Sequence, residues 1–504
     1  MASFAQKEGR ESPEESFECS HLLSGDRDLY QMVYVCETCY AGTNQCCCVG
    51  CASTCHAGHD VNMVGYAPCY CDCGASGCVH SSSARSTVRK GEAARASSTT
   101  GPTSAGPEWP LFQSHTFSHT GFVAPAKRES LELVQRSKET FWLALDSAPR
   151  CALEELALAV LYAHGGKVAA MGGAAVAGVE WWVQVKDPTS HQGGIDVHYD
   201  KDEALAEKYG VGVFPTVSTV TYLTGQAGVG LASQPTCVLD TKWGDEVGEP
   251  IEDMFVSFPR TGKHIAFRGN LLHGAPRLPP IDTAAGATEG KESKTATEEG
   301  EAEEGHRISF LVNVWTSASG RPEGCVPLSD SIATPLAQAS EWTRSALTLE
   351  IEEDEVATGR NLEVLQVEHE DESKGEGVDV IKVVLDKGEE EGEKKSPSGV
   401  EWTSVLLPFV SRDAAWGVGE DEQELLLMCS VPTAGVTGLE GPDGATNLHI
   451  RAEATEDSEP VMCLFYPGEL SDEDEDEDED EEEIWSEDSK DAECGRSAGD
   501  DDSI

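Results

Sequence analysis

The residues with the most obvious chemistry are crowded near the amino end of this 504-residue chain. Twelve of its 18 cysteines fall within residues 19–78, interleaved with three histidines. The spacings are Cys36-x2-Cys39, Cys48-x2-Cys51, Cys55-His56-x2-His59 and Cys71-Asp72-Cys73. Thiolates and imidazoles so spaced are typical tetrahedral zinc ligands, and metal binding would supply the folding energy of a segment with little apolar core. A disulfide framework is the alternative, but the polar first residues have no apolar signal-peptide core.

The run CASTCHAGHDVNMVGYAPCYCDCG resembles a UBR box, the module that reads protein N-termini for ubiquitin-dependent degradation. The resemblance covers residues 19–80 and rests on Cys-His-x2-His and Cys-Asp-Cys-Gly. It implies two to three zinc ions. One is held by Cys36, Cys39, His56 and His59. A binuclear centre with one shared thiolate uses Cys19, Cys51, Cys55, Cys71, Cys73 and Cys78, completed by Cys48 or His80. The resemblance leaves Cys46, Cys47 and Cys69 as bystanders.

UBR boxes bind a basic N-terminal residue through acidic side chains beside the zinc scaffold. Asp72 matches one acidic position, whereas Ala75, Thr43 and Asn44 stand where the family has other acids. A solvated turn residue is the alternative for Asp72. The implied partners are a protein or peptide with a basic N-terminus or tail, and ubiquitin ligase machinery. We see no RING-like or HECT-like segment, so we do not expect autonomous ligase activity.

A second set of residues is spread over strand-like segments farther along the chain. His198 and Asp200 follow an apolar run, His273 ends another, and Arg307 and Ser309 open RISFLVNVW. Two histidines and one carboxylate form the facial ligand set of non-haem Fe(II). An arginine fork matches a carboxylate, and a hydroxyl two residues later projects to the same strand face. The structural alternatives are that Asp200 caps the helix-like DKDEALAEKYG and that Arg307 pairs with a neighbouring acid.

This order of residues is similar to that of the 2-oxoglutarate- and Fe(II)-dependent oxygenases, whose fold is a double-stranded β-helix, or jelly roll. The resemblance implies that His198, Asp200 and His273 hold catalytic iron. It also implies that Arg307 and Ser309 bind the distal carboxylate of 2-oxoglutarate, with Tyr222 a further candidate. The implied activity is hydroxylation of a protein C–H bond. Arg307 follows His273 by 34 residues, farther than is usual in the family, which an inserted loop at 281–305 would explain.

Composition and periodicity predict a multidomain protein: a small zinc-stabilised module, an α+β domain of helices packed on an antiparallel β core, and an acidic disordered tail. The resemblance to the oxygenases implies that this β core is a jelly roll. In CALEELALAVLYAH the apolar residues recur at helical spacing, whereas segments rich in Val, Ile, Thr and aromatics predict strands. Acidic insertions are expected at 281–305 and in parts of 346–400. The predicted divisions are a disordered start (1–18), the zinc module (19–80), a flexible linker (81–108), the oxygenase-like domain (109–470) and the tail (471–504).

The net charge of −55 argues against nucleic-acid binding by general electrostatics and favours basic partners. No run of 18 apolar residues occurs, so no membrane partner is expected, and the thiol content predicts a reducing compartment, the cytoplasm or nucleus. Two functions remain open. The first is an oxygenase whose zinc module recruits protein substrates. The alternative is a non-catalytic recognition protein whose β domain is a scaffold.

Overall fold

A computed structural model describes the chain in separate stretches. The described residues are 17–77, 109–117, 120–172, 174–186, 194–225, 234–245, 247–276, 306–343, 351–353, 402–411, 423–432, 435–440, 446–452 and 460–465. The predicted linker at 81–108, the insertion at 281–305 and the tail at 471–504 lie outside these residues, as does most of the predicted disordered start.

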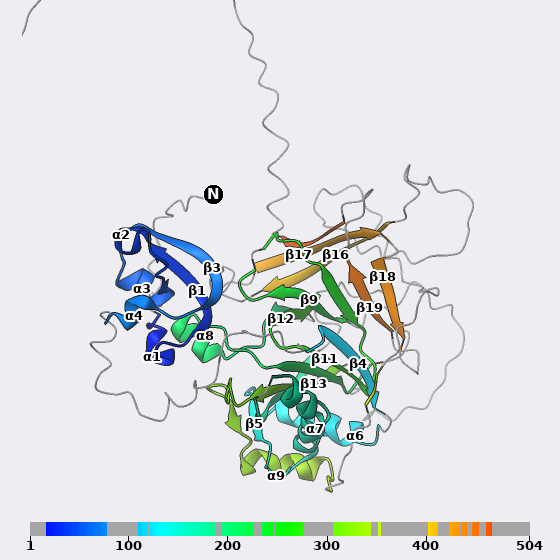
Figure 1. Ribbon diagram of the computed structural model, residues 1–504. Helices are drawn as coiled ribbons and strands as arrows, with labels where there is room; N and C mark the ends of the chain where they lie inside the picture. Colours follow the sequence, from blue (N-terminus) through cyan, green and yellow to red (C-terminus); the bar gives the residue numbers. More distant parts are fainter. Residues whose placement is uncertain are drawn as a thin grey trace, which may run out of the picture. The chain divides into compact units, whose positions relative to one another are not determined.

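The zinc module is a three-stranded antiparallel sheet, in the order β2-β1-β3, with short helices around it (Figure 1). Its strands are β1 (Leu29–Cys36), β2 (Cys47–Cys48) and β3 (Val61–Cys69). Its helices are α1 (His21–Ser24), α2 (Glu37–Tyr40), α3 (Val49–Thr54) and α4 (Asp72–Ala75). The buried cluster between these elements consists of cysteines, so thiols occupy the place of an ordinary apolar core. Close packing requires a glycine at Gly74, where a Cβ would lie 2.7 Å from Cys19 Sγ.

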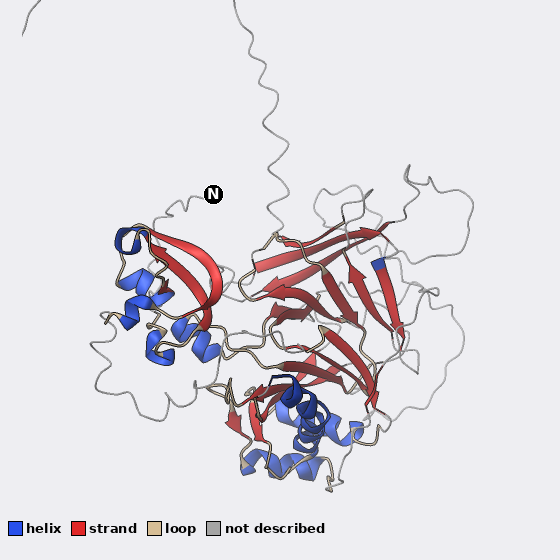
Figure 2. Cartoon of the chain, viewed as in Figure 1, coloured by secondary structure: helices blue, strands red, loops and turns tan. Residues whose placement is uncertain are grey.

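The β domain contains two large sheets (Figure 2). The order of the first is β14-β5-β6-β13-β8-β11-β4-β15. Its strands are β4 (Phe112–Phe117), β5 (Phe141–Ala144), β6 (Val176–Lys186), β8 (Val217–Tyr222), β11 (Lys263–Arg268), β13 (Arg307–Thr316), β14 (Val326–Pro327) and β15 (Ile351–Glu353). All of its described pairings are antiparallel except that of β5 with β14.

The order of the second sheet is β18-β19-β10-β9-β12-β7-β16-β17-β20. Its strands are β7 (Ile195–His198), β9 (Thr236–Lys242), β10 (Asp253–Ser257), β12 (Leu271–Ala275), β16 (Trp402–Ser411), β17 (Gln423–Pro432), β18 (Val436–Glu440), β19 (Thr446–Arg451) and β20 (Val461–Phe465). The strands after residue 401 thus extend both edges of this sheet, beside β7 and beside β10.

Helices cover one face of the first sheet. They are α6 (Val123–Val134), α7 (Ala152–Gly172) and α9 (Asp330–Ala339), while the shorter α8 (Glu203–Tyr209) follows β7. The helix predicted from the spacing of Leu153, Leu156 and Val160 is α7, and these three side chains are fully buried against the sheet. No helix within the described ranges is long and apolar enough to cross a membrane.

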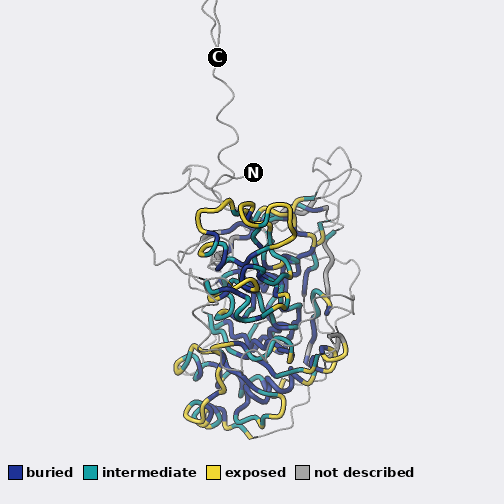
Figure 3. Tube along the Cα trace, turned by 60° about the vertical axis from the view of Figure 1, so that its left-hand side comes forward, coloured by how far each residue is buried: buried dark blue, intermediate teal, exposed yellow. Residues whose placement is uncertain are grey.

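The other face of the first sheet packs on the second sheet through a buried apolar cluster from β8–β13. All ten residues of β13 are buried, because its side chains alternate between two packed faces. Phe310, Val312 and Val314 belong to the cluster under the helices, whereas Leu311 belongs to the cluster between the sheets. The same alternation turns Arg307 and Ser309 towards the space between the sheets. Figure 3 shows the buried segments in dark blue and the exposed turns in yellow.

Candidate functional site

One group of metal-binding side chains joins β1, α2 and the turn after α3. Cys36, Cys39, His56 and His59 each offer a ligand atom, and these atoms all lie within 4.8 Å of one another. His59 Nδ1 is 3.5 Å from Cys36 Sγ and 3.2 Å from Cys39 Sγ. Burial opposes ionisation of Cys36, but hydrogen bonds from the Cys39 backbone and from His59 outweigh it and lower the pKa of this thiol to about 6. The group suits a tetrahedral zinc ion.

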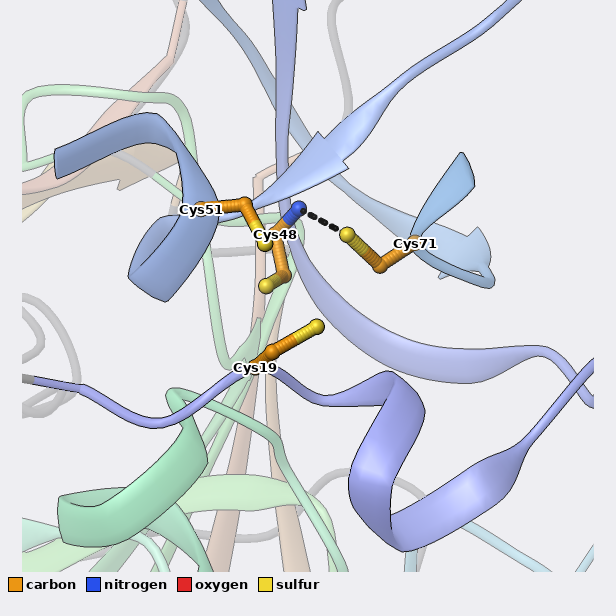
Figure 4. A group of neighbouring side chains, drawn as sticks. All are labelled: Cys19, Cys48, Cys51 and Cys71. Atoms are coloured by element: carbon orange, nitrogen blue, oxygen red, sulfur yellow. Dashed lines mark hydrogen bonds between the residues drawn. The ribbon is translucent and has the colours of Figure 1, made fainter. Parts of the chain in front are cut away.

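A second group is fully buried and consists of cysteines only: Cys19, Cys48, Cys51 and Cys71. Figure 4 shows the four side chains converging from β2, from α3 and from the chain just before α1 and α4. The Cys48 backbone N–H donates to Cys71 Sγ at 3.3 Å, which fixes the strand β2 against the start of α4. Four buried thiols without a disulfide between them match a zinc site whose ligands are all thiolates.

The third group, Cys51, Cys55 and Cys73, shares Cys51 with the second. Hydrogen bonding from Cys51 lowers the pKa of the Cys73 thiol to about 5, against the effect of burial. Among the described residues, Cys51 is therefore the thiol whose position would allow it to bridge two ions. Cys78 and His80, the other residues that the sequence proposes for this centre, lie outside the described residues.

The structure places Cys48 in the second group, which spacing alone left open between Cys48 and His80. Cys46, Cys47 and Cys69 belong to none of the groups formed by the described residues. Cys46 and Cys69 instead lie near each other, and a hydrogen bond between them contributes to lowering the pKa of the Cys46 thiol.

Asp72 lies in the first turn of α4, and its Oδ2 accepts a hydrogen bond from the Cys46 backbone N–H at 2.8 Å. Its carboxylate therefore also stabilises the turn that leads into β2. Charge repulsion from Asp72, and less strongly from Asp26 and Asp28, raises the pKa of the half-buried Tyr70 phenol. Negative charge is thus concentrated on this part of the zinc module.

The candidate iron site is built by pairing two antiparallel strands. His273 of β12 lies opposite His198 of β7, and their ring centroids are 4.4 Å apart. Asp200, just beyond the end of β7, has Oδ1 at 3.6 Å from His198 Nε2 and Oδ2 at 3.5 Å from His273 Nε2. These three are among the groups that could hold a metal ion.

Both imidazoles are oriented by main-chain oxygens. His198 Nδ1 lies 2.6 Å from Asp196 O, and His273 Nδ1 lies 3.0 Å from Leu271 O. A proton on each Nδ1 leaves the Nε2 lone pairs facing Asp200, as metal-ligating histidines require. Burial lowers the pKa of His273 to about 4, so its ring is neutral near pH 7, and its Nε2 is buried without a hydrogen-bond partner. The donor set and this orphaned nitrogen fit a divalent iron ion.

Arg307 and Ser309 lie at the start of β13 with buried, unsatisfied polar atoms. The Arg307 Nε and Nη1 atoms and the Ser309 hydroxyl have no hydrogen-bond partner, whereas Nη2 donates to Thr236 Oγ1 at 3.0 Å. Burial lowers the pKa of Arg307, and an arginine so buried calls for an anionic partner. A ligand carboxylate would satisfy these donors.

Tyr222 supports this arginine. Its ring centroid lies 5.6 Å from Arg307 Cζ, and its hydroxyl donates to Thr236 Oγ1 at 2.7 Å. The direct role of Tyr222 in binding a carboxylate stays a prediction. Thr236 was missed in the sequence, because a single threonine at a strand start carries no signal of its own. It neighbours Cys237, which lies opposite Gly274, so main-chain pairing connects the Arg307 region to His273.

Asp200 does not cap α8. The cap is Asp202, whose side chain accepts a hydrogen bond from the Leu205 backbone at 3.2 Å. The helix-cap alternative for Asp200 is therefore wrong. Because Asp202 caps the helix, the Asp200 carboxylate does not have to, and it faces the two histidines instead.

The geometry of residues 17–77 brings three groups of possible metal ligands together in one small module. Residues 16–79 match the family model of the UBR box, which identifies this segment. A part of the E3 ubiquitin-protein ligase hyd of Drosophila melanogaster is 41% identical over 56 residues. That match covers 11% of this chain and 2% of the ligase, so the likeness concerns the UBR box and not the rest of either protein.

Solved structures similar to the chain include a prolyl-4-hydroxylase from Pseudomonas putida, at 13% identity and a TM-score of 0.26, covering 41% of this chain and 86% of that one. Another is HygX from Streptomyces hygroscopicus with nickel and 2-oxoglutarate bound, at 13% identity and a TM-score of 0.24, covering 40% and 82%. Any chemistry assigned to this chain has to come from its own residues.

Proposed function

We propose that this chain is an Fe(II)- and 2-oxoglutarate-dependent protein hydroxylase whose UBR box binds the protein substrate. The observation that carries the oxygenase half is the convergence of His198, Asp200 and His273, with the orphaned Nε2 of His273 facing Asp200. The β domain also holds Arg307, whose buried Nε and Nη1 atoms have no hydrogen-bond partner. Separate residues are thus available for a metal and for an anion.

The protein's own contribution is to hold and orient. His198, Asp200 and His273 would hold iron on one face and leave the opposite positions open. Arg307 and Ser309 would fix the distal carboxylate of 2-oxoglutarate, and the Tyr222 ring and Thr236 would keep the guanidinium in place. When bound, iron and 2-oxoglutarate supply hydroxylation of a C–H bond by O2, with the keto acid converted to succinate and CO2.

The UBR box would bring the substrate. Zinc binding by the module and the ubiquitin-pathway likeness of its fold support recognition of protein N-termini, and the negative charge around Asp72 favours basic ones. Binding is expected to be strongest for peptides with a free, basic first residue and weak for acetylated ones. A connection with ubiquitin ligase machinery would follow from such recognition.

The oxygenase half is tested by incubating the full chain with Fe(II) and 2-oxoglutarate and measuring succinate. We expect turnover in the wild type and none in His198→Ala. His449→Ala is the matched control, since this histidine pairs with Asp253 in the same sheet and is no part of the site. Failure of the wild type to bind the keto acid or form succinate would leave the scaffold alternative.

The recognition half is tested by peptide binding. Asp72→Asn should weaken binding of a peptide with N-terminal arginine and leave zinc content unchanged. Asp60→Asn is the control, because Asp60 is an exposed acid of the same module. Equal binding by both variants would assign Asp72 to the turn alone.

A further inference from the structure

The segment from Asp200 to Val213 connects the candidate iron site to the zinc module. It starts at Asp200, forms α8, and leaves that helix at Gly210, whose φ of 64° is left-handed. Asp202 ties the start of this segment to its end, because its backbone N–H donates to Val213 O at 2.9 Å. The side chain of Asp202 also caps the first turn of α8. A movement of α8 would therefore shift Asp202 and, with it, the neighbouring Asp200.

Main-chain bonds join this segment to the zinc module. Gly212 N–H donates to Tyr30 O at 2.9 Å, and Val211 forms an antiparallel bridge with Gln31. Glu18 N–H donates to Lys208 O at 2.8 Å. Strand β1 of the zinc module thus pairs with β3 and also, through this bridge, with the chain that follows α8.

Apolar side chains also pack at this contact between the zinc module and the Asp200–Val213 segment. Leu29 of β1 is buried with Tyr209 and Val211 in one cluster, against which other leucines and a valine from both parts pack. Burial of these apolar side chains stabilises the contact in addition to its main-chain hydrogen bonds. It belongs to the compact unit formed by residues 1–465.

A second apolar contact lies beside the first. The Tyr66 ring of β3 packs edge-on against Trp243, with centroids 4.8 Å apart, and Trp243 is only 4% exposed. The approach is so close that a Cβ on Gly244 would lie 2.4 Å from the Tyr66 ring. A Cβ on Gly210 would lie 2.6 Å from Val49 Cγ1. Two glycines of the β domain therefore stand where the zinc module touches it.

We propose that the zinc module is a positioning element of the candidate iron site, holding the segment that carries Asp200 in its ligating conformation. This inference rests on the proposed function for the identity of the site. Metal affinity falls in proportion to the fraction of molecules whose ligands are in place. Loosening the contact with the zinc module therefore weakens iron binding although no ligand has changed.

The test uses the full chain and substitutions confined to the zinc-module side. Leu29→Ala and Tyr66→Ala should keep the wild-type zinc content, speed amide hydrogen exchange in residues 199–213, and leave exchange in β8 unchanged. Both should weaken Fe(II) binding about tenfold, the size of a typical coupling between sites. Tyr66→Phe keeps the ring, and Val64→Ala changes a side chain of the same strand that is 66% exposed. Both controls should behave as the wild type.

If the wild type binds Fe(II) but amide exchange in Leu29→Ala and Tyr66→Ala is unchanged, this inference is overturned and the proposed function is not. Faster exchange with unaltered iron affinity also overturns it, because the module would then cover the segment without positioning the ligand. A wild type that binds no Fe(II) overturns the proposed function, and the positioning of an iron site with it.

Discussion

His273 Nε2 lies 3.5 Å from Asp200 Oδ2, although His273 belongs to β12 and Asp200 follows the end of β7. The contact follows from strand register, because His273 pairs directly with His198 and Asp200 stands just past the end of that strand. Main-chain hydrogen bonds therefore fix the spacing of the three groups, and their side chains need only one rotamer each to converge on a metal.

Replacing Asp200 with Asn keeps the size of the side chain but removes its charge. We expect Mn(II), which replaces Fe(II) here because it does not oxidise in air, to bind on the order of 100-fold more weakly. Losing a residue that only hydrogen-bonds a metal ligand already weakens metal binding about 10- to 100-fold, and Asp200 is proposed as a ligand itself. Equilibrium dialysis measures the affinity. Asp253→Asn, which loses its ion pair with Arg451, is the matched control, and equal Mn(II) affinity in the two variants would rule out the site.

Arg307→Lys keeps the positive charge and loses the planar fork. Binding of 2-oxoglutarate to the Mn(II)-loaded protein should weaken about tenfold or more, the value of one charge-assisted hydrogen bond. Calorimetric titration gives the affinity. Arg136→Lys alters an arginine that pairs with Glu132 on the surface of α6 and should bind normally. If both variants bind alike, Arg307 is not the carboxylate partner.

Glu180 predicts a pH dependence in the metal-free protein. Burial, and after it repulsion from Asp200, raises its pKa from 4.5 to about 7, while Asn313 and Trp315 donate to its carboxylate. The folded state therefore holds the proton more tightly than the unfolded chain. The free energy of unfolding should fall as the pH rises from about 4.5 to about 7, by up to about 3 kcal/mol.

Glu180→Gln cannot ionise and should lack this part of the pH profile. Urea unfolding at about pH 5 and about pH 8 measures the difference, with the variant gaining stability relative to wild type at the higher pH. Glu132→Gln, at a half-buried position where the carboxylate pairs with Arg136, should retain the wild-type slope. A wild-type profile that Glu180→Gln leaves unchanged would contradict the assignment.

The shared thiol of the zinc module predicts unequal losses of metal. Cys51 belongs to two ligand groups and Cys39 to one. Serine is a poor zinc ligand, so Cys39→Ser should lose one zinc ion and Cys51→Ser two. Native mass spectrometry counts the ions. Cys463→Ser lies outside these groups and should keep them all, and equal losses from the two zinc-module variants would show that Cys51 does not bridge.

Much of the site could be predicted because its signals are local. Cys-x2-Cys pairs and the Cys-His-x2-His run bring their ligands together within one turn, and the β-branched segments around Tyr222 and Arg307 are strands in the structure. The helix α7 follows from the spacing of its leucines. His198, Asp200 and His273 could be singled out because their order resembles that of a known enzyme family, and the structure brings the three side chains together.

The remainder depends on pairing between distant segments, which spacing does not encode. The second zinc group takes Cys19 from before α1 and Cys71 from the start of α4, so only the folded sheet shows that Cys48 completes it. Thr236 is placed beside Arg307 by the packing of two sheets. The docking of Val211 on β1 likewise has no sequence signal, since a bridge of one residue pair leaves no pattern.

The contact of Tyr66 with Trp243, and the bridge beside it, bear on how the protein behaves when its chain is cut. A proteolytic nick between residues 77 and 109 would break the covalent link and leave the two fragments bound to each other. Expressed apart, each fragment would present a bare apolar surface and tend to self-associate. Co-expression of the two pieces should restore a soluble heterodimer.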